Sequence, residues 1–155
     1  MNVIELKAII QNQILIENLV SIRLDIINGA DGLISYNKII RENVQNLPGI
    51  YVLENDATNE VWYIGMAGKV NQQGEISTHS VSKRLQASRG KDPKTKKDIQ
   101  TNKYLLDLML KENCLQLNIH IFHLQKGQLP GYIEAILINQ FYQRNGILPI
   151  YNSAF

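Results

Sequence analysis

Residues 49–66 read GIYVLENDATNEVWYIGM, and this stretch decides the fold. Two runs within it, 49–54 and 60–66, are rich in β-branched, aromatic and other apolar residues, which is typical of strands. The five residues between them, Asn55-Asp56-Ala57-Thr58-Asn59, are rich in turn formers and have the length of a hairpin connection. The stretch therefore predicts an antiparallel β-hairpin.

The rest of the chain predicts helices and one more strand around this hairpin. Alternating apolar positions predict a strand at 115–124, and apolar residues at helical spacing predict helices over 3–27, 36–43, 80–88, 102–111 and 132–144. Asn28-Gly29 and Asn145-Gly146 are expected to end the first and last helices, and Ser80 or Thr78 to cap the third. We expect an α/β (α+β) fold: a small three-stranded, mainly antiparallel sheet flanked by helices, with a helical extension at 1–46 packed on a core domain at 47–155.

Composition limits the class of protein. The 155 residues suit one domain, and the contents of 45% hydrophobic and 19% charged residues are ordinary for a globular chain. The single cysteine, Cys114, lies among apolar residues, so we expect a core residue and a reducing, cytoplasmic compartment. Polar and charged residues interrupt the first 20 positions, which argues against a secretory signal or a membrane span there.

Tyr51 and Tyr63 are the first candidates for chemistry. Two phenols held side by side on a rigid hairpin can position a water molecule and shuttle its proton. Tyrosine is also a common strand residue, and either tripeptide, Gly-Ile-Tyr or Tyr-Ile-Gly, is weak evidence alone. Their occurrence together on paired strands is far more specific.

Arg84 and Glu134 are charged residues next to apolar stripes. Arg84 lies beside Val81 and Leu85, where a guanidinium can hold a phosphate or simply face solvent. Glu134 interrupts a helix that is otherwise apolar on nearly every side, and such interruptions concentrate at functional sites. A carboxylate there suits Mg²⁺, which is often held by one or two carboxylates, phosphate oxygens and water. It equally suits the positive end of the helix dipole, and the pattern does not decide between the two.

Basic residues cluster between positions 83 and 103. Eight are present, against only Asp92 and Asp98: Lys83, Arg84, Arg89, Lys91, Lys94, Lys96, Lys97 and Lys103. Such a run is usually a solvated loop, but beside Arg84 it also makes a track for a phosphate backbone. His79 and Asn152 are weaker candidates, because polar residues in loops and tails are more often without a role in chemistry.

Together these residues resemble the GIY-YIG nuclease family. The resemblance covers residues 48–152 and rests on five elements in the family's order: Gly49-Ile50-Tyr51, Tyr63-Ile64-Gly65, Lys83-Arg84-Leu85, Glu134 and Tyr151-Asn152. It implies a DNA-cutting enzyme with the family's fold that uses one divalent ion, Mg²⁺ or Mn²⁺, to hydrolyse a phosphodiester bond.

The resemblance also implies a role for each residue. Tyr51 matches the tyrosine that acts as general base or orients the attacking water, and Tyr63 matches the one that supports the phosphate and water network. Arg84 is similar to the arginine that contacts the scissile phosphate, and Glu134 to the metal ligand. Asn152 resembles the asparagine that closes the site.

The chain departs from the family pattern in three places. Met66 follows Gly65 where some members have a nearby lysine, so Lys69 or Lys83 has to tune the tyrosine if an amine is required. Ser88 stands where some members have a histidine one turn after the arginine, and His79 is the candidate to replace it. The loop at 68–79 is longer than in the compact members, which favours a type II restriction enzyme that reads a sequence.

Several functions stay open on the sequence. The first is a metal-dependent DNA endonuclease in restriction, and its alternatives are a structure-specific repair or recombination nuclease and a mobile-element nuclease. The second is a DNA-binding member of the fold without catalysis, which the missing lysine and histidine favour. The third is an interaction protein whose apolar segment 3–27 packs on a partner or on a second copy in a homodimer.

Overall fold

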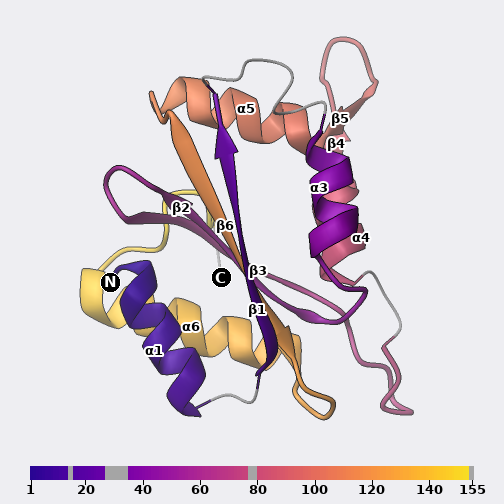
Figure 1. Ribbon diagram of the computed structural model, residues 1–155, viewed down its shortest axis with the longest axis vertical. Helices are drawn as coiled ribbons and strands as arrows, with labels where there is room; N and C mark the ends of the chain where they lie inside the picture. Colours follow the sequence, from indigo (N-terminus) through magenta and orange to yellow (C-terminus); the bar gives the residue numbers. More distant parts are fainter. Residues whose placement is uncertain (14–15, 27–34, 77–79, 154–155) are drawn as a thin grey trace.

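A computed structural model describes residues 1–13, 16–26, 35–76 and 80–153. Figure 1 shows the elements in chain order: α1 (Val3–Gln13), β1 (Ile16–Asp25), α3 (Tyr36–Asn43), β2 (Gly49–Asn55), β3 (Glu60–Ala67), α4 (Val81–Gln86), β4 (Ser88–Lys91), β5 (Asp98–Gln100), α5 (Thr101–Lys111), β6 (Gln116–Leu124) and α6 (Pro130–Asn145). The fold is a mixed α+β arrangement of one central sheet with helices on both faces.

The central sheet is antiparallel and has the strand order β1-β6-β2-β3. The hairpin of β2 and β3 is confirmed, with Tyr51 opposite Gly65 and Leu53 opposite Tyr63. The two tyrosines are therefore diagonal neighbours on one face and not a directly opposed pair. The expected count of three strands in the described part of the sheet is wrong, because β1 adds a fourth.

The helix predicted over 3–27 is wrong beyond α1. Residues Ile16–Asp25 form β1, which pairs along its length with the outer edge of β6. From Val20 onward apolar and polar residues alternate: Ile22 and Leu24 are buried, whereas Ser21 and Arg23 are exposed. This period of two is the signal of a strand. Residues 1–46 thus supply a strand of the central sheet as well as helices.

Helices cover the two faces of the sheet as separate layers. Helices α3, α4 and α5 pack on one face, over Tyr51, Leu53 and Trp62. Helices α1 and α6 pack on the other, where Val3, Leu6, Ile10, Ile133, Leu137, Ile138 and Phe141 lie against Ile50, Val52, Ile64 and Phe122. The predicted strand alternation at 115–124 is confirmed, since Leu117, Ile119 and Ile121 are on the first face and Phe122 is on the second.

The ends of α4 and α6 follow local signals in the sequence. The Ser80 side chain caps α4 by accepting from the Lys83 N–H, and Gly146 ends α6 in the left-handed conformation. Residues 90–97, predicted as a basic loop, belong to a second hairpin: β4 pairs with β5 in a two-stranded ribbon, and residues 92–97 form the loop between them. Within the described residues, no helix is both long enough and apolar enough to span a bilayer.

A hydrogen-bonded polar group lies on the sheet face that α1 and α6 cover. The Glu54 carboxylate accepts from His120 Nε2 at 2.7 Å, and His120 Nδ1 lies 2.8 Å from the Ser21 hydroxyl. Because a carboxylate only accepts, Nδ1 is left to accept from Ser21. His123 lies on the opposite face, as its spacing from His120 predicts, and accepts from the Gln45 N–H. Cys114 is buried, as expected of a core residue.

Candidate active site

The two motif tyrosines lie side by side on the face that α3, α4 and α5 cover. Their ring centroids are 5.7 Å apart and the ring planes are tilted by 33°. Both rings lie over Gly65, where a Cβ atom would come 2.3 Å from Tyr63 Cε1 and 2.9 Å from Tyr51 Cζ. Glycine is therefore required at this position because the phenols occupy the space of a side chain.

Glycine is also required at position 49, because neighbouring elements pack closely against its backbone. A Cβ atom there would lie 2.4 Å from the Phe122 carbonyl oxygen of β6 and 3.0 Å from Val81 Cγ2 of α4. The absence of a side chain lets β2, β6 and α4 meet closely at this point. Gly49 and Gly65 thus have a packing reason to flank the tyrosines.

The two phenols differ in their access to solvent. Tyr51 is completely buried, and its oxygen has no partner in hydrogen-bonding geometry among the described residues. Tyr63 is partly exposed. Burial first, and then the neighbouring Tyr51 phenol, raise the pKa of Tyr63 far above its ordinary value of 10.0. Tyr63 is therefore a neutral hydroxyl at physiological pH, and it is the phenol that can meet a ligand.

The outer edge of β3 carries backbone groups that other segments satisfy. The Tyr151 N–H donates to the Trp62 carbonyl at 2.9 Å. The Asn152 side chain accepts from the Ile64 N–H at 2.9 Å and donates to the Ile64 carbonyl at 2.8 Å. The amide of Asn152 therefore acts like one residue of a further strand and protects the open edge of the sheet.

Glu134 and Arg84 approach this edge from opposite faces of the sheet. Glu134 is half-buried in the first turns of α6, while Arg84 is exposed on α4. Burial raises the pKa of the Glu134 carboxyl, while a hydrogen bond from the Met66 backbone and the charge of Arg84 lower it in part. Glu134 also acts on the Tyr63 phenol. Glu134 thus feels the charge of Arg84 and acts on Tyr63, while Asn152 bonds to the backbone of Ile64, the residue after Tyr63.

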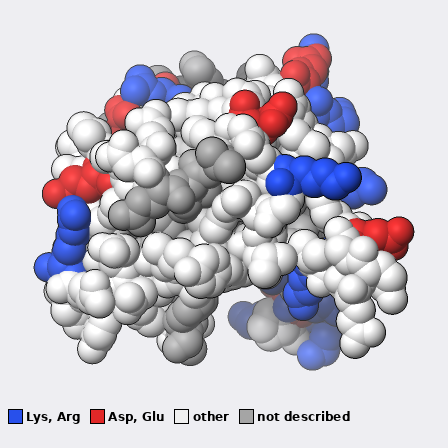
Figure 2. All heavy atoms as spheres, turned by 90° about the horizontal axis from the view of Figure 1, so that it is seen from below, with Lys and Arg blue, Asp and Glu red and all other residues white. Residues whose placement is uncertain are grey.

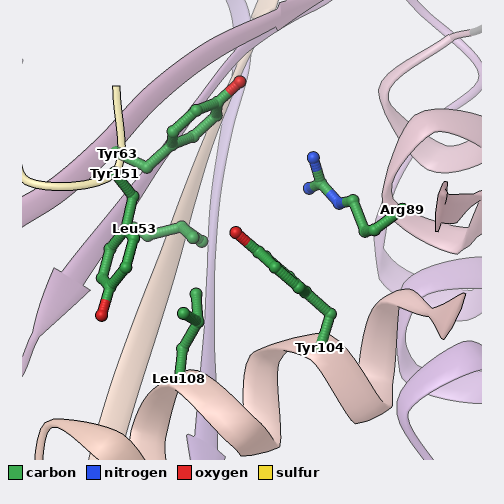
Figure 3. A pocket seen from close by; sticks show the side chains of 6 residues that line it. All are labelled: Leu53, Tyr63, Arg89, Tyr104, Leu108 and Tyr151. Carbon is green, nitrogen blue, oxygen red and sulfur yellow. The ribbon is translucent and has the colours of Figure 1, made fainter. Parts of the chain in front are cut away.

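Arg89 belongs to the interior of this site, although the sequence pattern places it among the DNA-binding residues. Its guanidinium carbon lies 5.6 Å from the centroid of the Tyr104 ring. A small cavity of about 20 Å³ is lined by Leu53, Tyr63, Arg89, Tyr104, Leu108 and Tyr151. Figure 3 shows the Arg89 guanidinium reaching toward this cavity from the side opposite Tyr63 and Tyr151, with Tyr104 rising from α5. A cavity of this size holds about one water molecule.

The remaining predicted site residues lie elsewhere or outside the description. His79 falls outside the described residues. Lys69 is exposed and lies two residues beyond the end of β3, and Lys83 is exposed on α4. Neither lysine is among the groups that act on the Tyr63 phenol, whereas Arg89 is. Arg89 carried no signal in the sequence beyond its place in a basic run.

Four exposed lysines of the basic run lie on the β4–β5 ribbon. Lys91 ends β4, and the loop to β5 presents Lys94, Lys96 and Lys97, called here the hairpin-tip lysines. The Asp92 carboxylate fixes this loop by accepting from the Lys94 and Thr95 N–H groups at 2.8 and 2.7 Å. Figure 1 shows the β4–β5 ribbon projecting at the upper end of the molecule. Figure 2 shows the opposite, lower face, where charged side chains lie mainly near the rim.

The donor set at Glu134 fits a divalent ion that takes most of its ligands from substrate and water. The described residues hold no group of three or more His, Cys, Asp or Glu side chains that could cage a metal. Mg²⁺ does not need such a cage, because one carboxylate, phosphate oxygens and water complete its octahedron. A half-buried carboxyl with a raised pKa gains from a nearby cation.

In comparisons with known proteins, no family model, no curated protein and no solved structure matches this chain. The function therefore has to be inferred from the geometry of the site.

Proposed function

We propose that this chain is a divalent-metal-dependent DNA endonuclease of the GIY-YIG type that hydrolyses phosphodiester bonds. One observation supports the proposal: Glu134 of α6 interacts electrostatically with Arg84 of α4 and with Tyr63 of β3, and Asn152 bonds to Ile64 beside Tyr63. A neutral phenol, an exposed guanidinium and a half-buried carboxyl are groups that a metal-assisted attack on a phosphate can use.

Each group has a part in that reaction. Arg84 offers paired donors and a fixed charge to the scissile phosphate. Glu134 would hold Mg²⁺ or Mn²⁺, which supplies Lewis-acid stabilisation of the phosphate oxygens. Tyr63 orients the attacking water from the sheet, with Tyr51 behind it. Asn152 holds the edge of β3 in place, so it acts on the site through the backbone.

The β4–β5 ribbon and α4 give the DNA its track. Lys83 and Arg84 on α4 are exposed, and the ribbon adds Lys91 and the hairpin-tip lysines. A two-stranded ribbon can enter the major groove of duplex DNA. Together with the long segment after β3, this favours a type II restriction enzyme that reads a sequence. Double-strand cutting at a symmetric site needs two active sites, so a homodimer goes with this role.

Plasmid cleavage tests the proposal. Supercoiled DNA is incubated with the protein and Mg²⁺ or Mn²⁺ over a range of salt, with a chelator as blank. We expect nicking or linearisation that the chelator abolishes and that Glu134→Gln reduces by more than about a hundredfold. Glu42→Gln is the matched control, because Glu42 is an exposed carboxylate on α3 that pairs only with Lys38 within the described residues.

The products separate the biological roles. Discrete fragments indicate a restriction enzyme, and cutting restricted to branched DNA indicates repair or recombination. If neither ion supports cleavage at any salt, and Glu134→Gln behaves as the original chain does, the nuclease proposal is wrong.

The complete burial of Tyr51 favours a second candidate, a DNA-binding module without catalysis. A general base must reach the proton it removes, and the oxygen of Tyr51 is shielded from solvent. This candidate predicts salt-dependent DNA binding that neither metal nor Arg84→Ala changes beyond the loss of one charge.

A further inference from the structure

A row of three hydrogen-bonded side chains crosses the adjacent strands β1, β6 and β2. Ser21 of β1 lies directly opposite His120 of β6, and His120 lies opposite Val52 of β2. Glu54 follows two residues later on β2, so it reaches His120 diagonally from the same face of the sheet. The Ser21 hydroxyl is 2.8 Å from His120 Nδ1, and His120 Nε2 is 2.7 Å from a carboxylate oxygen of Glu54. The register of the sheet thus holds a serine, a histidine and a glutamate in contact.

The chemistry of the three groups sets the direction of their hydrogen bonds. A carboxylate only accepts, so Nε2 of His120 carries the proton that Glu54 accepts. The lone pair of Nδ1 is then left to accept from the Ser21 O–H. Burial lowers the pKa of His120 below the ordinary 6.5, although the hydrogen bond to Glu54 raises it in part. The imidazole is therefore neutral at physiological pH and able to take the serine proton through Nδ1.

The exposure of the three side chains matches the roles of a nucleophile, a base and the group that holds the base. Ser21 is exposed on β1, the outer strand in the order β1-β6-β2-β3, whereas His120 and Glu54 are only 5% and 6% exposed. A hydroxyl is a weak nucleophile until an adjacent base takes its proton, and the base is in turn oriented by a third group. The buried carboxylate holds the imidazole here, and the exposed hydroxyl can meet a substrate from solvent.

Glu54 is itself held by a network at the end of the β2–β3 hairpin. The Asn118 side chain donates to Glu54 at 3.2 Å and to Asp56 at 2.7 Å. Arg23 donates to Asp56 at 2.9 Å and so fixes the far side of this network. A catalytic arrangement needs supporting contacts of this kind, because they hold the reacting groups in one geometry. The carboxylate of Glu54 is therefore kept in place beside His120.

We propose that Ser21, His120 and Glu54 form a second catalytic site, which hydrolyses small activated carboxylic esters with Ser21 as nucleophile and His120 as general base. Glu54 is a positioning residue, because it touches His120 and not the substrate. An exposed serine offers few contacts to a substrate, so the reaction depends on a good leaving group, as in an aryl ester. The site lies on the sheet face opposite Tyr51 and Tyr63, and it is independent of the proposed nuclease function.

The reaction has two halves. In the first, the Ser21 oxygen bonds to the carbonyl carbon while its proton passes to Nδ1 of His120, and the carbonyl electron pair moves onto oxygen. The bond to the leaving oxygen then breaks, and that oxygen takes the proton from Nδ1, which leaves an acyl group on Ser21. In the second half, water attacks the same carbon and gives a proton to Nδ1, and the Ser21 oxygen leaves and recovers it. The products are a carboxylic acid and an alcohol or phenol.

Ester cleavage and mass spectrometry test the proposal in the full chain. The protein is mixed with p-nitrophenyl acetate, release of the phenol is followed over time, and the acetylated residue is located by peptide mapping. We expect continued release above the buffer blank, with acetyl on Ser21, and a loss of more than about tenfold in Ser21→Ala. Ser21 is exposed, so this change does not disturb the core. Ser88→Ala is the matched control, because Ser88 is also an exposed serine on a strand.

The pH profile separates catalysis from a merely structural hydrogen bond. The rate should be full above pH 6.5 and fall at lower pH, as His120 gains a proton. The charged groups that act on His120 are Glu54 and Asp56, which raise its pKa, and Lys7 of α1, which lowers it. Glu54→Gln should therefore move the midpoint of the profile to lower pH and reduce the rate, although glutamine can still accept from Nε2. Lys7→Met should move the midpoint to higher pH.

Each remaining outcome overturns the inference. If acetyl is absent from Ser21, or if Ser21→Ala releases the phenol as fast as the original chain, Ser21 is not a nucleophile. A single burst of phenol without continued release shows that the second half of the reaction fails, and the site is then no esterase. Midpoints that stay in place in both Glu54→Gln and Lys7→Met exclude His120 as the base. Plasmid cleavage should be the same in Ser21→Ala and the original chain, so the two proposals fail separately.

Discussion

Gly65→Ala tests whether the tyrosine pair requires glycine beneath it. The new Cβ would lie 2.3 Å from Tyr63 Cε1, and ordinary contact begins at 3.4 Å, so a ring has to move by about an ångström. Tyr51 is completely buried and cannot give way, so Tyr63 must turn outward. Overpacking of this kind costs about 3 kcal/mol at the upper end. Alanine recovers about 1 kcal/mol because it restricts the unfolded strand more than glycine does.

We therefore expect Gly65→Ala to lower the free energy of unfolding by about 2 kcal/mol and the melting temperature by about 4–8 °C. Urea unfolding followed by the fluorescence of Trp62 measures this directly, because Trp62 is the single tryptophan and is buried in β3. Gly131→Ala is the matched control. Its Cβ would meet only Met66 Cε at 3.9 Å, so it should be neutral or slightly stabilising.

A double mutant identifies the cause. If the two rings occupy the space above Gly65, the same change in a Tyr63→Ala background should cost less than half as much. The reasoning is refuted if Gly65→Ala is as stable as the original chain, or if its cost is the same with and without the Tyr63 ring.

Three other predictions follow from the site and the core. Asn152→Ala should lower the free energy of unfolding in urea by about 1–3 kcal/mol, because both backbone groups of Ile64 at the sheet edge lose their partner. An unchanged free energy of unfolding would contradict this contact. Burial lowers the pKa of His120 and of His123 below the ordinary 6.5, so the unfolded chain binds more protons than the folded one as the pH falls. The free energy of unfolding should therefore be highest above pH 6.5 and should decrease as the pH falls through the pKa values of the folded state. Thermal melts at a series of pH values check this, and a flat profile would contradict it. Changing the three hairpin-tip lysines to glutamine should reduce the slope of log affinity for DNA against log salt by about 3, measured by fluorescence anisotropy, and an unchanged slope would place the DNA elsewhere.

Much of the fold follows from local pattern. Apolar periodicity predicts the hairpin of β2 and β3, the strand at β6 and the helices α3, α5 and α6. Ser80 marks the start of α4 and Gly146 the end of α6. These signals depend on residues close together in the chain, so they can be recognised without knowledge of the tertiary structure. The candidate residues Tyr51, Tyr63, Arg84 and Glu134 were found in the same way, from residue types that stand out against their local pattern.

What only the tertiary structure decided depends on contacts between distant residues. The apolar run at 16–25 suits a helix or a strand, and the free edge of β6 about a hundred positions away selects the strand. Asn152 gains its role because its amide meets the open edge of β3. Arg89 was indistinguishable in sequence from the lysines around it, and only the fold places it at a cavity that Tyr63 and Tyr104 also line. The sequence alone thus determined which side chains are candidates for chemistry. The packing of the sheet decided that Arg89 lines a cavity with Tyr63, because a charge acquires its neighbours only when distant segments meet.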